Sequence, residues 1–312
     1  MKRLTIICLS FLAATVVADA QNVRGTRFGS WTTPINIGSP VNSTADDVSP
    51  VISKDGRTLY FSSTRPGSQG EDMWVSRRAN ERSEWGEPVN LGSVVNSTGV
   101  DRVRSISPDG RVLLFQSNRL GTGGSDIWAS VRQRKNDDLS WGPPVNLGTM
   151  INSAADEVAA NYLFGSDRHG AKLFFSSGRF GLPDIYESDI PFEGNFGEPV
   201  NVAELNSPHV ESCIWISADG LEIIFSSTRP DPANLLSSYD LFTATRASVE
   251  DRWDPPASLG PTVNAEGYQD VGPTVSSDGE TMYFSSRRPG GLGSAGSSDI
   301  YVTTRKKVRG NQ

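Results

Sequence analysis

Cysteine and histidine are almost absent from this sequence, with two residues of each in 312. Cys8 lies in a terminal segment that we expect to be removed, so Cys213 has no partner for an internal disulfide. The fold must therefore be stabilised by packing alone. The two histidines, His169 and His209, are too few for a His-rich zinc site, and we predict no metal.

Helical periodicity is also missing, and one apolar run stands out, from Leu4 to Val17. It follows Lys2 and Arg3 and precedes Ala18-Asp19-Ala20, the pattern of a signal peptide. We predict a signal peptide over residues 1–20, cleavage before Gln21, and a periplasmic or secreted protein. No other stretch is long enough to span a membrane.

Positive charge is in deficit, with 29 Lys and Arg against 36 Asp and Glu. Losing the predicted signal leaves 27 against 35, a net charge of −8, which argues against a nucleic-acid partner. No phosphate loop, dinucleotide fingerprint or GxSxG element is present. We therefore predict no cofactor.

What the chain does have is a repeat, seen first in the stretch from Asp47 to Arg77. It predicts three short strands joined by Lys54-Asp55-Gly56 and a glycine-bearing loop, because Asp-Gly pairs favour tight turns. The second strand recurs five times, as LYFSSTR, LLFQSNR, LFFSSGR, IIFSSTR and MYFSSRR. The third copy is altered, with a longer first strand and Asp167-Arg168-His169-Gly170 at the turn.

A fourth element precedes each unit and begins with an aromatic residue. These residues are spaced 54, 56, 55 and 57 positions apart: Trp31, Trp85, Trp141, Phe196 and Trp253. Four strands repeated at about this period are typical of a β-propeller. We therefore predict an all-β, five-bladed propeller in one domain over residues 21–312.

The order of the elements predicts how the ring closes. The first aromatic element, residues 31–37, precedes blade one, and the last unit has none after it, so we expect that segment to complete blade five and remove two open edges. The expected blades are 38–92, 93–148, 149–203, 204–260, and 261–305 with 31–37. Only 21–30 and 306–312 look like loose ends.

The motif SxDGxxLYFSSxRxGxxDIYxxxR, from Trp31 to Arg305, resembles the WD-like repeat of TolB-type periplasmic propellers. The longer form, with WGxPVNLGxxVNS ahead of each unit, is similar to repeats of bacterial envelope proteins. The resemblance implies an exported propeller that binds a protein or another ligand, since the repeat specifies a scaffold more than a function.

An acidic residue opens the first strand of every blade: Asp47, Asp101, Glu157, Glu211 and Asp270. Because this strand lines the ring axis in a propeller, the five carboxylates could surround a cation or a polar ligand. Alternatively, each pairs with an arginine that ends a second strand, such as Arg65 or Arg119. A feature present in every blade favours the structural explanation.

A second acidic series opens the third strands: Asp72, Asp126, Asp184, Asp240 and Asp299. An Asp after a glycine-rich loop accepts backbone N–H bonds from that loop. Calcium binding by such loops is the alternative, but one carboxylate per loop supplies too few ligands. We expect this series to be structural.

Departures from the repeat are the other candidates for a ligand site. Arg102 and Arg104 stand where most blades have small or apolar residues. The other departures, which with the five acids make up the expected ligand-binding set, are Tyr162, His209, Trp215 and Tyr268, with Asn161, Cys213 and Gln269 beside them. Such a mixture of aromatic, cationic and amide groups suits a sugar or peptide. Drift in loops is the alternative.

Three functions remain open at this level. The first is a non-enzymatic, monomeric binding module for a protein, a cell-envelope component or a carbohydrate. The second is a glycoside hydrolase or lyase, which needs two carboxylates about 5 to 9.5 Å apart, for which Glu157 and Glu211 are the candidates. The third is a lectin with sites between blades, disfavoured because sugar-stacking aromatics are not repeated. Cys213 and His209 are too far apart on a strand for a nucleophile and its base.

Overall fold

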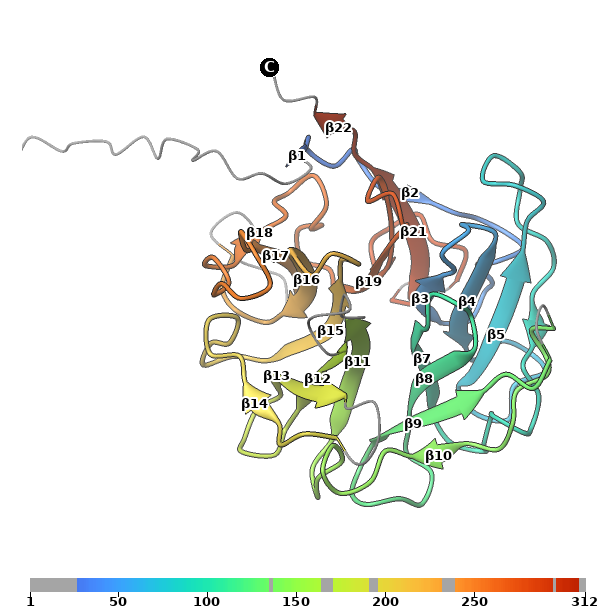
Figure 1. Cartoon of the computed structure of the whole chain (residues 1–312). Coiled ribbons are helices and arrows are strands. Elements are labelled where there is room, and N and C mark those ends of the chain that lie inside the picture. Colours follow the sequence, from blue (N-terminus) through green and yellow to red (C-terminus); the bar gives the residue numbers. More distant parts are fainter. Residues whose placement is uncertain are drawn as a thin grey trace, which may run out of the picture.

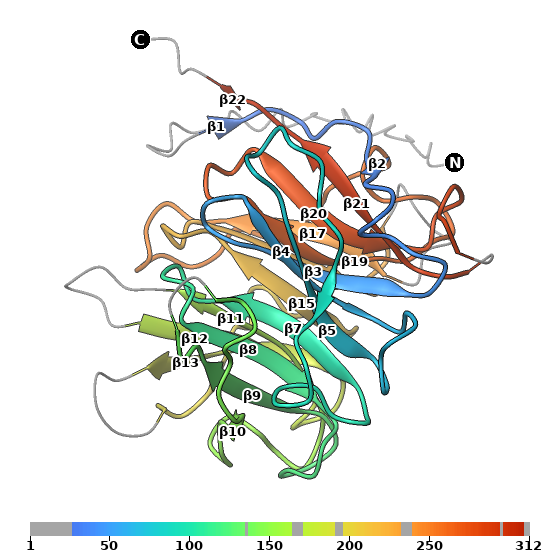
Figure 2. The same ribbon diagram turned by 90° about the vertical axis from the view of Figure 1, so that its right-hand side faces the viewer.

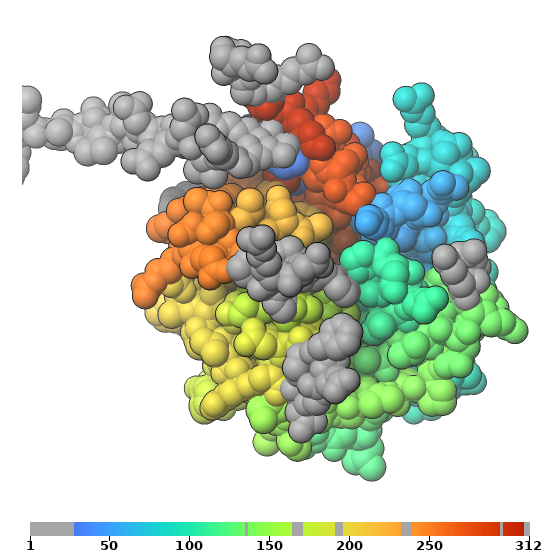
Figure 3. All heavy atoms as spheres, viewed as in Figure 1, coloured from blue at the N-terminus to red at the C-terminus, as the bar shows by residue number. Residues whose placement is uncertain are grey.

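The computed structural model describes residues 27–134, 137–163, 171–190, 196–231, 239–293 and 296–308. Within them lie five four-stranded antiparallel sheets and one two-stranded sheet, with no helix. The five sheets surround one axis, and the sequence colours follow one another around the ring (Figures 1 and 3). The prediction of a five-bladed propeller is confirmed.

Blades one to four run outward from the ring axis in chain order, and blade five does so except for its outermost strand. Blade one has β3 (Asp47–Ile52), β4 (Thr58–Ser63), β5 (Asp72–Arg77) and β6 (Val89–Asn90). Blade two has β7 (Asp101–Ile106), β8 (Val112–Ser117), β9 (Asp126–Val131) and β10 (Val145–Asn146). Blade three has β11 (Glu157–Leu163), β12 (Ala171–Ser177), β13 (Asp184–Ile190) and β14 (Val200–Asn201). Blade four has β15 (Glu211–Ile216), β16 (Glu222–Ser227), β17 (Asp240–Thr245) and β18 (Ala257–Ser258). Blade five has β19 (Asp270–Val275), β20 (Thr281–Ser286), β21 (Asp299–Thr304) and β2 (Ile35–Asn36).

The ring closes as the order of elements predicts. β2 pairs antiparallel with β21, placing Ile35 opposite Val302, and completes blade five with a strand from the other end of the chain (Figure 2). Closure covers the sheet edge that blade five would otherwise expose.

The expectation of loose ends outside the ring is wrong for the part the structure describes. β1 (Arg27–Phe28) pairs with β22 (Lys307–Val308) in a small extra sheet. Phe28 lies under the Arg305 guanidinium, whose carbon is 3.9 Å from the ring centroid. The two ends are therefore joined a second time, outside blade five.

Each second strand is buried on both faces. In β4 all six residues are buried, although Leu59 and Phe61 alternate with Tyr60 and Ser62. One face packs on the preceding blade and the other on the following blade, so the polar–apolar alternation of a half-exposed strand does not develop. A core cluster shared by blades one and two shows this packing, because it contains Tyr60 and Val75 together with Val103 and Phe115.

Arginine side chains stack on the repeated aromatic residues of the fourth element. Arginines that follow the third strands lie over these rings at 4.2 to 4.6 Å, in the pairs Arg305–Trp31, Arg78–Trp85, Arg132–Trp141 and Arg246–Trp253. Blade three differs, since its Phe196 packs against an apolar cluster. The expectation that these aromatics serve strand packing is consistent with this arrangement.

The asparagine of each VNS motif binds the segment that leads into the next blade to the third strand of the preceding blade. Asn96 accepts from the Met73 nitrogen at 2.9 Å and donates to the Met73 oxygen at 3.1 Å. Asn42 makes the equivalent pair of bonds to Ile300. Both side chains are buried, so these Asn-x-Ser/Thr sequences are part of the fold. Among the described residues, no helix is long and apolar enough to cross a membrane.

Candidate functional site

The five acids that open the innermost strands are fully buried. Asp47, Asp101, Glu157, Glu211 and Asp270 are each 0% exposed. Each faces the arginine that follows the second strand of its own blade, at 2.5 Å (Arg65), 2.7 Å (Arg119), 3.9 Å (Arg179), 2.9 Å (Arg229) and 2.6 Å (Arg288). A buried carboxylate paired in this way is a structural element.

The serine of the VNS motif also donates to these carboxylates in four blades. Ser207, for example, donates from its hydroxyl and its backbone nitrogen to Glu211, at 2.6 and 3.1 Å. Ser153 does the same for Glu157 at 2.7 and 2.8 Å. The choice of Glu157 and Glu211 as an acid and base is therefore not supported: both carboxylates are enclosed and hydrogen-bonded, and neither faces a space for substrate.

In four blades the aspartate of the second acidic series accepts a hydrogen bond from the asparagine of the fourth strand. Asp72 accepts from Asn90 at 2.8 Å and from the Gln69 nitrogen at 3.2 Å. Asp126 and Asp299 hold Asn146 and Asn36 in the same way, each at 2.7 Å. Among the described residues, no group of three or more His, Cys, Asp or Glu is placed to hold a metal ion.

Side chains that depart from the repeat do meet near the ring axis. The Arg104 guanidinium, from β7, lies 3.4 Å from the Ser49 hydroxyl of β3 and 3.5 Å from the Cys213 thiol of β15. It also donates to the Gln116 side-chain oxygen of β8. We call Ser49, Arg104, Gln116 and Cys213 the axial cluster. Because blades two and four are not neighbours in the ring, their contact places this cluster near the axis (Figure 1).

Gln116 was not a sequence-based candidate, although it also departs from the repeat. At this position the other blades have a serine that bonds to the next blade. Ser62 and Ser285 accept the Val103 and Ser49 backbone nitrogens at 3.0 and 2.9 Å. Gln116 instead accepts from Arg104 of its own blade, so the two departures are bonded to each other.

Arg102 is paired with Glu71, a second residue that was not among the sequence-based candidates. Its Nε and Nη2 donate to the two oxygens of Glu71, at 2.6 and 2.8 Å. Glu71 lies just before Asp72, where no other blade has an acid. Both residues depart from the repeat, Gln116 within the second strand and Glu71 just before the third. The alignment of the repeats therefore contains the signal for both.

Arg104 has no such partner. Within the part of the chain that the structure describes, no carboxylate lies within ion-pair distance of it. Its Nε is buried and makes no hydrogen bond. Burial lowers the pKa of Arg104, because removal from water disfavours the charged form.

The backbone is constrained at the same level of the ring. Ser49 and Cys213 have φ values of 55° and 49°, and Gly272 occupies the equivalent position of blade five with φ of 67°. Non-glycine residues in this region cost about 1–3 kcal/mol. The bulges that produce it direct Ser49 and Cys213 toward Arg104.

The remaining expected ligand residues lie apart from the axial cluster. Trp215 packs against the core that contains residues of blades four and five. Tyr162 packs against the core shared by blades two and three, and burial raises its pKa. His209 is half-buried in the loop before β15, and Tyr268 is 38% exposed.

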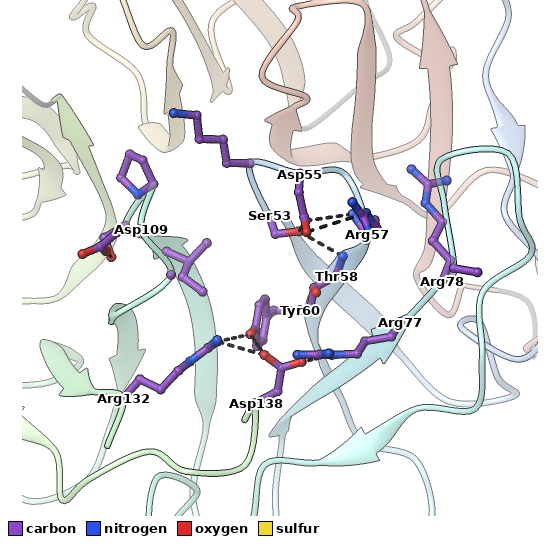
Figure 4. Close-up of a pocket in the computed structure, with 16 residues that line it drawn as sticks. Ser53, Asp55, Arg57, Thr58, Tyr60, Arg77, Arg78, Asp109, Arg132 and Asp138 are labelled. Carbon is purple, nitrogen blue, oxygen red and sulfur yellow. Dashed lines mark hydrogen bonds and ion pairs between the residues drawn. The ribbon is translucent and has the colours of Figure 1, made fainter. Parts of the chain in front are cut away.

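A separate pocket lies between blades one and two, at the turns that end β3 and β7, with a volume of about 720 Å³ (Figure 4). On its wall Tyr60 donates to Asp138 at 2.6 Å, and Arg132 binds the same carboxylate at 2.9 Å. Arg77 also contacts Asp138. Burial raises the pKa of Tyr60, so the phenol stays protonated. These bonds join the two blades, although the Arg132 Nε is buried without a hydrogen-bond partner.

Solved structures with the same fold support the architecture. A thermostable family-43 glycoside hydrolase is 13% identical, covering 88% of this chain and 93% of that chain, with a TM-score of 0.58. A GH62 hydrolase in complex with xylotriose is 12% identical, covering 90% and 99%, with a TM-score of 0.56. TolB from Acinetobacter baumannii is 14% identical, covering 88% and 63%, with a TM-score of 0.49.

The likenesses to the family-43 and GH62 enzymes show the fold. No protein-family model and no curated protein sequence matches the chain. A propeller fold is shown, whereas a TolB-type specificity is not.

Proposed function

We propose that this protein is an exported propeller that binds a carbohydrate at its ring axis. The observation that carries the proposal is the axial cluster, where non-repeating polar side chains from three blades converge. Arg104 and Cys213 are only half-buried, so solvent reaches them. Because the repeated polar groups described above hold the blades together, polar groups that do not repeat are the better candidates for recognition.

The carbohydrate class of ligand is supported by solved structures that share this fold. The neighbours of highest TM-score named above are glycoside hydrolases, one of them solved with xylotriose. Because fold alone does not fix function, this similarity selects the ligand class to test first. Protein or cell-envelope partners are the next to test.

Binding is placed ahead of catalysis because of the enclosed acids. Hydrolysis of a glycosidic bond needs a carboxylic acid and a carboxylate on either side of that bond. The five acids of the innermost strands are held by arginines and serines, as shown for Glu157 and Glu211.

A glycoside hydrolase is the second candidate, favoured by the shared architecture with the family-43 and GH62 enzymes. Such an enzyme would have to draw its acid and base from outside these five residues. The assay is release of reducing sugar from the oligosaccharides that bind.

The proposed place of action is the periplasm or the exterior, following the signal peptide expected over residues 1–20. Processing is tested by expressing the full chain with its leader, fractionating the cells and sequencing the mature amino terminus. A mature protein beginning at Gln21 supports export; retention of Met1 in the cytoplasm contradicts it.

The experiment for the function itself is a panel of neutral and acidic oligosaccharides titrated into the purified protein by calorimetry. Saturable binding that Arg104→Gln weakens, with no product formed, supports the proposal. Turnover of a bound oligosaccharide would replace it with the hydrolase. Absence of binding to every glycan, with a stable protein partner captured from envelope extract, would contradict the carbohydrate assignment.

A further inference from the structure

The charge of Arg104 is the least compensated feature of the axial cluster. The side chains that contact it belong to Ser49, Cys213 and Gln116, and none of them is a carboxylate. A guanidinium carries five N–H donors, and the contact to the Ser49 hydroxyl is long at 3.4 Å. The Nε group is buried with no partner. A buried polar group of this kind is normally satisfied by a protein group, a water or a ligand.

The Glu71 carboxylate lies near Arg104 but already binds another arginine. Glu71 exerts a Coulombic effect on Arg104, but both of its oxygens accept from Arg102. Arg102 and Glu71 therefore form a closed ion pair, and Arg104 contributes an unpaired positive charge beside it. An anion that reached Arg104 would gain a charge-assisted hydrogen bond without displacing an existing partner.

The surroundings of Arg104 hold it in place for this purpose. In other blades the serine at the Gln116 position bonds to the backbone of the next blade. Gln116 instead accepts a hydrogen bond from Arg104. Ser49 and Cys213 approach it from strands that adopt a costly backbone conformation. Orienting a guanidinium in advance reduces the entropy that ligand binding must overcome.

We propose that Arg104, with Ser49 and Gln116, binds the carboxylate of an acidic saccharide at the ring axis. The saccharide part of this inference rests on the proposed function, whereas the anion part rests on Arg104 alone. A uronic acid fits both parts, since it presents a sugar ring and one carboxylate. Planar carboxylates match the fork of an arginine better than they match a lysine.

The experiment compares a galacturonate disaccharide with the corresponding galactose disaccharide, which has a hydroxymethyl group in place of each carboxylate. Calorimetry measures both ligands on the wild type, Arg104→Gln, Arg104→Lys and Arg111→Gln. Arg111 is the matched control, because it is an exposed arginine of the same blade. We expect the wild type to prefer the acidic ligand and Arg104→Gln to bind it about 10- to 100-fold more weakly. Arg104→Lys should fall between them, and Arg111→Gln should match the wild type.

The free protein supplies a second readout. Because Arg104 is uncompensated without ligand, Arg104→Gln should unfold at or above the wild-type temperature. A purely structural arginine would instead give a less stable or unfolded variant, and that result overturns the proposal. So does a folded Arg104→Gln that keeps the full preference for the acidic disaccharide.

Acetate and phosphate separate this inference from the function it rests on. If either anion raises the unfolding temperature of the wild type but not of Arg104→Gln, and no saccharide binds, the anion site stands and the carbohydrate function fails. If both disaccharides bind equally well and Arg104→Gln changes neither, the carbohydrate function stands and this inference fails.

Discussion

Asn36 donates a hydrogen bond to Asp299 at 2.7 Å, across 263 positions of the chain. The same bond joins Asn90 to Asp72 and Asn146 to Asp126 within single blades. The join between the two ends of the chain is therefore built like an ordinary blade. A propeller closed in this way unfolds as one unit, because opening the join exposes two sheet edges.

Replacing Asn36 with alanine should lower the free energy of unfolding by about 1.5–3 kcal/mol, the range for a hydrogen bond to a charged group. Urea denaturation measures the change. Asn90→Ala is the matched control, since it removes the equivalent bond from an internal blade. A loss at Asn90 with none at Asn36 would show that the ring is not fastened at this join.

Glu211→Gln should destabilise the protein by about 3 kcal/mol or more, because it leaves the Arg229 guanidinium buried without its counter-charge. Oligosaccharide binding, measured on the folded fraction, should be unchanged. The exposed Glu266 provides the control, and Glu266→Gln should have no effect. A stable Glu211→Gln that has lost binding or turnover would restore Glu211 as a functional residue.

The stacking of arginine on tryptophan predicts that Arg246 and Arg252 of blade four contribute differently to the free energy of unfolding. Arg246 lies 4.2 Å above the Trp253 ring and donates to the Gly220 oxygen at 2.7 Å, whereas the Arg252 side chain is 89% exposed. Arg246→Ala should lower the free energy of unfolding by about 2 kcal/mol. Arg252→Ala should change it by less than about 0.5 kcal/mol. Equal effects would mean that the stack contributes nothing.

The turn that follows β7 predicts a pH dependence. Ser107 donates to Asp109 at 2.5 Å and the Arg111 nitrogen does so at 3.0 Å, and these bonds lower the pKa of Asp109. A carboxyl whose pKa is lower in the folded state stabilises the fold at pH values above its unfolded pKa of about 3.9. That contribution is lost as the pH falls through the folded pKa.

Urea denaturation from pH 5 to pH 2 measures this effect. Asp109→Ala should lose less stability over this range than the wild type, and Ser107→Ala should behave in the same direction. Parallel curves for all three proteins would contradict the assignment.

The five blades and their closure could be predicted because they depend on residues that recur at a fixed spacing. The pairing of the first-strand acids with arginines such as Arg65 was the favoured explanation for the same reason. The second join, between β1 and β22, could not be predicted, because two-residue strands leave no pattern. Stacking of arginine on the repeated tryptophans depends on side-chain direction, which spacing does not reveal.

The sequence predicted only part of the axial cluster. Arg104 departs visibly from the repeat, but its bond to Gln116 and its approach to Cys213 depend on bulges in the innermost strands. A bulge changes which way a side chain points without changing the residue pattern. The expected set of eleven ligand residues combined the buried acids with the departures from the repeat, and it stays a prediction.

Alkylation of Cys213 tests the central claim most directly, because its thiol is half-buried and 3.5 Å from the Arg104 guanidinium. The rate of its reaction with iodoacetamide is followed by peptide mass spectrometry, with and without a saturating acidic oligosaccharide. Ligand at the ring axis should slow the modification of Cys213 at least several-fold in the wild type, and the same ligand concentration should slow it less in Arg104→Gln. Saturable ligand binding with an unchanged rate in the wild type would show that the ligand is bound elsewhere.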